Sequence, residues 1–134
     1  MPLTDEQLNT LLDMQDKLYG SLSEADRATN LEIRQKALAD GGKEAMLEEL
    51  TETFKAADTQ GTGRLTFAQF KDFSDKLMNN YVSRGAVKME IPDDDFQTGY
   101  DIHNSVSEED GVSLEEFLAN MAQQMEARKA RGGM

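Results

Sequence analysis

The chain has 134 residues, enough for one domain with a hydrophobic core, and it contains no cysteine, which excludes disulfides and thiol chemistry. Its 26 acidic side chains outnumber its 14 basic ones and give a net charge of −12, which argues against non-specific binding to nucleic acid or to an anionic membrane. The N-terminal stretch lacks the regions of a signal peptide, and no apolar run is long enough to span a bilayer. We therefore expect a soluble cytoplasmic protein that attracts cations or basic partners.

The first predicted elements are two helices at the N-terminus. Thr4 and Gln7 have the spacing of a capping box, and leucines recur at intervals near 3.6 residues along the helix that follows, over residues 7–19. Ser23 can cap a second, more polar helix over residues 24–40, which two glycines would end. These elements predict an N-terminal helical segment over residues 1–42.

The middle of the chain predicts a helix, a loop and a second helix. An amphipathic helix over residues 43–57 ends at Asp58, where the loop begins. Thr66 and Gln69 repeat the capping-box spacing before another amphipathic helix, over residues 67–81.

The last third of the chain repeats this arrangement. Pro92 precedes a short helix over residues 93–103, because proline is tolerated where a helix begins. A polar, acidic stretch follows. Ser113 and Glu116 then have the capping-box spacing before a final helix over residues 114–131.

The helices around Asp58 share one register of apolar residues with the loop between them. Apolar side chains stand one, four, eight and eleven places before Asp58 and recur at helical spacing after the loop: Ala57, Phe54, Leu50, Leu47, Phe70, Phe73 and Leu77. Gly63 holds the sixth place of the loop and Leu65 the eighth.

In this register the chain resembles an EF-hand pair of the calmodulin and troponin C superfamily, over residues 43–134. The resemblance implies an all-α fold with helix-loop-helix units at residues 43–80 and 93–131. It also implies a short antiparallel β contact between the two loops, at Leu65 and Val112. One or two N-terminal helices would be added to this pair.

The resemblance also implies which side chains would hold Ca²⁺ in the first loop. Loop places 1, 3, 5, 7, 9 and 12 supply oxygen ligands in the family, and affinity follows their charge. The matching residues are Asp58, Gln60, Thr62, Arg64 (through its carbonyl), Thr66 and Gln69. Only Asp58 is anionic, and Arg64 adds a positive charge beside the site. We expect this loop to keep its shape but to bind Ca²⁺ weakly or not at all.

The second loop is richer in carboxylates but irregular in length. Glu116 matches the twelfth place, yet a start at Asp101 or Asn104 makes the loop too long, and a start at Ser105 gives a poor first ligand. The tentative ligand set comprises Asp101, Asn104, Glu109, Asp110 and Glu116. If the chain binds Ca²⁺, we expect this loop to hold it, although acid-rich loops are often only solvated turns.

Methionine-rich helices invite a partner-binding interpretation. Methionine side chains adapt to varied surfaces, but they also simply fill gaps in cores. The tentative partner groove comprises Phe73, Leu77, Met121 and Met125, and we expect the apolar stripe of the N-terminal helix to pack near it. The alternatives are that this helix docks on the back of the domain or projects freely and recruits a second copy of the chain. His103, the single histidine, is expected to have a packing role.

Two functional hypotheses follow. The first is a calcium-binding regulator that engages a partner helix through weak or partly lost calcium sites. The alternative is a calcium-independent, light-chain-like or scaffold subunit that binds a basic amphipathic helix. We do not expect an enzyme, because the sequence has no nucleophile elbow, no glycine-rich phosphate loop and no cysteine nucleophile.

Overall fold

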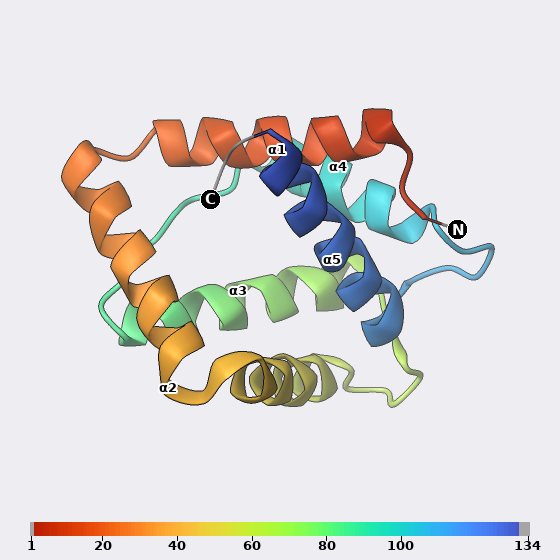
Figure 1. Cartoon of the computed structure of the whole chain (residues 1–134). Helices are drawn as coiled ribbons and strands as arrows, with labels where there is room; N and C mark the ends of the chain where they lie inside the picture. The colour runs from red at the N-terminus through yellow and green to blue at the C-terminus, as the bar shows by residue number, and fades with distance from the viewer. Residues whose placement is uncertain (1, 132–134) are drawn as a thin grey trace.

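The computed structural model describes residues 2–131. The structure is mostly helical with one two-stranded antiparallel sheet, so the predicted all-α class is confirmed. Residue 1, in the predicted N-terminal segment 1–42, and residues 132–134, in the predicted pair over residues 43–134, lie outside the described range. Within that range, no helix combines the length and apolar character that crossing a membrane requires. The elements in chain order are α1 (Asp5–Gly20), α2 (Glu24–Ala57), β1 (Arg64–Leu65), α3 (Phe67–Ser83), α4 (Asp93–Asn104), β2 (Val112–Ser113) and α5 (Leu114–Ala130) (Figure 1).

Side-chain caps set where the helices begin. The three predicted capping boxes are all present, at the starts of α1, α3 and α5. The Ser23 side chain also accepts from the backbone N–H of Asp26, as predicted for α2. Because a cap satisfies backbone N–H groups that have no partner within the helix, these short signals predict helix starts well.

The long helix α2 breaks where the sequence predicts two separate helices. Gly42 has φ 63° and ψ −160°, a non-helical conformation that residues with a Cβ rarely adopt. The helix resumes immediately, so the predicted boundary is a kink rather than a loop. In Figure 1 the first half of α2 descends from the end of α1, and α2 then packs against α3.

The two loops meet through the strand pair. Leu65 of β1 lies opposite Val112 of β2, and Arg64 lies opposite Ser113. Leu65 and Val112 are both fully buried. The predicted contact between these two residues is therefore confirmed.

Aromatic side chains fill the space beneath the strand pair. The ring centroid of Phe73 lies 5.7 Å from that of Phe54 and 5.1 Å from that of Phe117, both edge-on. Leu47, expected on the apolar face of its helix, is instead 47% exposed and does not join this core. The buried members of the core are Phe54, Ala57, Leu65, Phe70, Phe73, Phe96, Tyr100 and Val112.

The N-terminal helix α1 docks against α4 and α5. Leu11 and Leu12, from its predicted apolar stripe, are buried. The backbone N–H of Leu3 donates to Gln123 Oε1 of α5 at 2.9 Å. At the far end of this contact, Arg128 of α5 forms an ion pair with Asp16 of α1. Apolar burial and polar pairing together hold α1 in place.

The predicted partner groove does not form as one surface. Phe73 is only 1% exposed and lies inside the aromatic core, with Leu77 packed against that core. Met121 is half-buried, whereas Met125 is 45% exposed. Phe73 is therefore enclosed by the core and Met125 is open to solvent, while packing of α1 near the four residues stays a prediction.

Candidate functional site

The first loop is closed by the carboxylate of Asp58. Its Oδ2 accepts from the backbone N–H of Gly63 at 2.8 Å, and its Oδ1 accepts from the backbone N–H of Thr62 at 3.1 Å. Gly63 has φ 82°, which permits the sharp turn that brings these N–H groups inward. The single carboxylate among the predicted ligands of this loop is therefore occupied by backbone donors.

The remaining predicted ligands of the first loop also bond to one another. The Thr62 hydroxyl donates to the carbonyl of Arg64 at 2.8 Å. This carbonyl is the ligand expected at the seventh place of the loop. Gln69 Oε1 accepts from the backbone N–H of Thr66 at 3.0 Å, and Gln69 Nε2 lies 3.4 Å from the Thr59 hydroxyl. Gln60, by contrast, is exposed. Hydrogen bonds thus connect most of the groups that the resemblance assigns to an ion.

The second loop begins at Asn104, where α4 ends. Asn104 Oδ1 accepts from the backbone N–H of Gly111 at 2.8 Å, and Asn104 Nδ2 donates to Asp110 Oδ1 at 3.0 Å. Asn104 thus closes its loop through a backbone N–H, as Asp58 does in the first.

The guanidinium of Arg64, from the first loop, lies among oxygen atoms of the second loop. Its Nη2 donates to Glu116 Oε1 at 2.7 Å and to the carbonyl of Gly111 at 2.9 Å. Its Nε donates to the carbonyl of Asp110 at 3.1 Å. Nη2 also lies 3.3 Å from the carbonyl of Glu109, and Nη1 lies 3.3 Å from Glu109 Oε2. One side chain therefore contacts three carbonyls and two carboxylates.

The charge of Glu116 is stabilised by these contacts. Burial alone would raise the pKa of Glu116, but the backbone N–H of Ser113 and the Arg64 guanidinium outweigh it and hold the pKa below its ordinary value. Both side chains are largely screened from solvent, with exposures of 19% for Glu116 and 21% for Arg64. Because both groups are partly buried, removing one of them would leave the other with an uncompensated charge that is screened from water.

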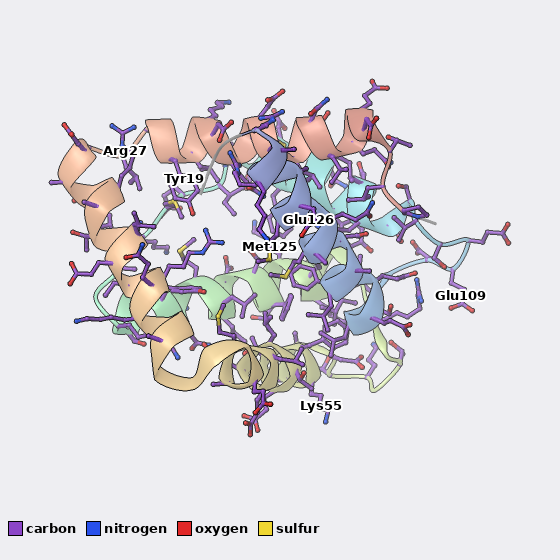
Figure 2. All side chains as sticks on the ribbon, viewed as in Figure 1. Tyr19, Arg27, Lys55, Glu109, Met125 and Glu126 are labelled. Carbon is purple, nitrogen blue, oxygen red and sulfur yellow. The ribbon has the colours of Figure 1, made fainter. Side chains whose placement is uncertain are left out.

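The second predicted ligand set is only partly brought together. Four of its members surround the loop, but Asp101 lies a turn back on α4, where its Oδ1 accepts from Gln97 Nε2 at 2.9 Å. Glu109 points outward at the edge of the molecule (Figure 2), with its side chain 77% exposed. Among residues 2–131, no three His, Cys, Asp or Glu side chains are grouped so that they could hold a metal ion.

Large apolar side chains are exposed away from the loops. They are Tyr19, Leu47, Val82 and Met125. In Figure 2, Tyr19 at the end of α1 and Met125 on α5 both project over the region between α1 and α3. Burial raises the pKa of Tyr81 on α3, Arg34 opposes this shift, and the neighbouring Tyr19 adds to it.

Sequence reasoning missed the role of the Arg64 side chain. It assigned Arg64 a carbonyl ligand and a nearby positive charge, but not a contact with the other loop. A usable signal was present, because Arg64 precedes Leu65, which was expected in the contact between the loops. A long cationic side chain beside that contact can reach the acidic loop opposite.

Comparisons of the chain with protein-family models, with curated proteins and with solved structures find no match.

Proposed function

We propose that the chain is an EF-hand-type helix-loop-helix pair that binds a protein partner without requiring calcium. The supporting observation is the internal closure of the first loop. The Asp58 carboxylate accepts from the backbone of Thr62 and Gly63, and Gln69 serves in a capping box. Because these groups already have hydrogen-bond partners within the chain, an ion would have to replace bonds rather than fill a vacant cage.

A basic amphipathic helix is the partner that this chain fits best. The net charge of −12 favours a cationic partner and speeds its encounter with the chain. The exposed side chains of Tyr19 and Met125 offer apolar contact area of an adaptable kind. Binding, rather than catalysis, is the function that these features support.

Two titrations test this proposal. Metal-stripped protein is first titrated with CaCl₂ and MgCl₂ by calorimetry, and then with a synthetic helical peptide carrying lysine on one face and leucine on the other. We expect the affinity of the chain for the helical peptide to be the same in EGTA and in millimolar Ca²⁺. A control peptide of the same composition but scrambled order should bind more weakly. Peptide binding that requires Ca²⁺, or equal binding of both peptides, would overturn the proposal.

A calcium-dependent regulator is the second candidate, and one observation favours it. Glu116, Glu109 and the carbonyl of Gly111 already converge on a positive charge in the second loop. If the chain binds Ca²⁺ at all, Glu116→Gln should remove most of the binding, whereas Asp58→Asn should matter less. Equal or reversed effects would show that the two loops are ranked wrongly.

A further inference from the structure

The loop pair contains a cation of its own. Arg64 extends from β1 into the second loop, and its guanidinium contacts the carbonyls of Glu109, Asp110 and Gly111. The same guanidinium pairs with Glu116 at 2.7 Å. A guanidinium has five N–H donors in a fixed plane and remains charged at every physiological pH. It can therefore satisfy several oxygen atoms of one loop at once.

The backbone places this side chain where it cannot easily turn away. Arg64 adjoins Leu65, which is fully buried in the strand pair with Val112. A Cβ on Gly111, the residue before Val112, would lie 3.1 Å from Arg64 Cβ and 3.0 Å from the Leu65 carbonyl oxygen, so the two loops approach closely here. Gly111 also has φ 95°, which favours glycine. The close approach directs the Arg64 side chain across the second loop.

We propose that Arg64 is the resident cation of the second loop, an internal latch that joins the two loops and closes the second without a metal ion. The charge balance supports this role. Without Arg64, the carboxylate of Glu116 would retain the backbone N–H of Ser113 but would have no neutralising charge beside it. The three carbonyls would likewise lose a shared donor. The inference rests on the proposed function in treating the two loops as one paired unit.

The latch makes the second loop indifferent to divalent cations in the unmodified chain. A divalent ion could reach Glu116 only by expelling a guanidinium that is held by several hydrogen bonds. Replacing Arg64 by a neutral residue removes this competitor without removing any of the oxygen atoms of the loop. The loop should then open, and an added cation should close it again.

Amide hydrogen exchange in the metal-free protein tests this latch. For Arg64→Gln, we expect the exchange rates of the Gly111 and Ser113 amides to rise at least about tenfold. The reason is that the variant loses a charge-assisted hydrogen bond, so the loop opens more often. Millimolar Ca²⁺ should slow exchange in this variant and leave the parent unchanged. Arg84→Gln is the matched control. Arg84 Nη2 lies 2.9 Å from Glu49 Oε2, and this ion pair joins α2 to the end of α3, outside the two loops. It should leave the amides of the second loop unaffected.

Three outcomes would overturn the latch. One is unchanged exchange in a folded Arg64→Gln variant. Another is an equally large effect of Arg84→Gln at the same amides. The third is slowing by Ca²⁺ of the parent as much as of the variant, which would make the metal, not Arg64, the cation of the loop.

A measurement without substitution covers the case in which Arg64→Gln does not fold. The Nε–H of Arg64 donates to the Asp110 carbonyl at 3.1 Å, so its NMR signal should be protected from exchange. It should remain unchanged when Ca²⁺ is added. A fast-exchanging signal, or one that Ca²⁺ shifts, would refute the latch. Because no partner peptide is present, failure here differs from failure of the peptide titration.

Discussion

The ring Nδ1 of His103 lies 2.9 Å from the side-chain Nδ2 of Asn120, and both side chains are buried. With the Asn120 amide donating from Nδ2, Nδ1 of the histidine accepts this hydrogen bond. The imidazole is also enclosed by Phe70 and Phe117, each with its ring centroid 5.5 Å away. This confirms the packing role expected for the single histidine, and burial of the ring favours its neutral form.

The neutral state of His103 makes stability depend on pH. Burial lowers the pKa of His103 from 6.5 to about 4, so between these values the unfolded chain binds a proton that the folded chain refuses. The stabilisation is full above pH 6.5 and is lost as pH falls toward about 4, a change of about 3 kcal/mol in the free energy of unfolding. Urea unfolding at several pH values should show this slope in the parent and a smaller slope in His103→Gln. Parallel slopes would refute the assignment.

The first loop should become a calcium site when its charge is restored. Gln60→Asp combined with Gln69→Glu supplies anionic ligands on a frame that already has Asp58 and Gly63. Glutamate also suits the capping box of α3, so the change should not disturb the helix start. Calorimetry should show Ca²⁺ affinity at least about tenfold above that of the parent.

Gln7→Glu provides the matched control for that experiment. Gln7 occupies the same position in the capping box of α1, outside the loops, and its replacement adds the same charge. We expect Gln60→Asp with Gln7→Glu to bind Ca²⁺ clearly more weakly than the loop variant. Equal affinities would mean that added charge, and not the loop frame, causes the binding.

Docking of α1 should contribute measurably to stability. Leu12 is 1% exposed, and its replacement by alanine should lower the free energy of unfolding by about 2–5 kcal/mol. Leu47→Ala removes the same atoms from a side chain that is 47% exposed and should cost much less. Deleting residues 1–20 should lower the melting temperature and increase binding of a hydrophobic dye. Unchanged melting in Leu12→Ala would contradict the docking of α1 described here.

A polar pair should hold the first half of α2 to the segment between α3 and α4. Asn30 Oδ1 accepts from the backbone N–H of Val87 at 2.7 Å, and Asn30 Nδ2 donates to the backbone carbonyl of Val87 at 3.2 Å. Asn30→Ala leaves both backbone groups without this partner and should cost about 1–3 kcal/mol. Amide exchange at Val87 should accelerate, whereas the exposed control Asn79→Ala should have no effect there. Equal exchange in both variants would show that the pair does not restrain this segment.

The sequence predicted local features of the fold more reliably than contacts between distant residues. Thr4, Thr66 and Ser113 each act within three residues of their partners, so their caps could be recognised from spacing. The contact of Leu65 with Val112 came from the register of the resemblance. Helix ends shifted by a residue or two, because the last turn of a helix is weakly specified.

Contacts that depend on side-chain direction were not predictable in the same way. Helical spacing assigned both Phe73 and Met125 to one groove. In the structure Phe73 is buried and Met125 is exposed, and spacing alone does not distinguish these outcomes. The reach of Arg64 across the strand pair likewise depends on its rotamer and on the close approach at Gly111. Spacing along one chain does not encode either of these features.

The contacts between α1 and α5 join residues that are 109 to 122 positions apart in the chain. During synthesis, α1 is made before α4 and α5, the helices against which it docks. The contacts of α1 with α5 can therefore form only after α5 has emerged, whereas those with α4 can form earlier. The two helix-loop-helix units have shorter closing distances and can assemble earlier, because loop-closure entropy must be overcome before distant contacts form. A chain cut short within α5 would leave the side of α1 that faces α5 uncovered, with a risk of aggregation.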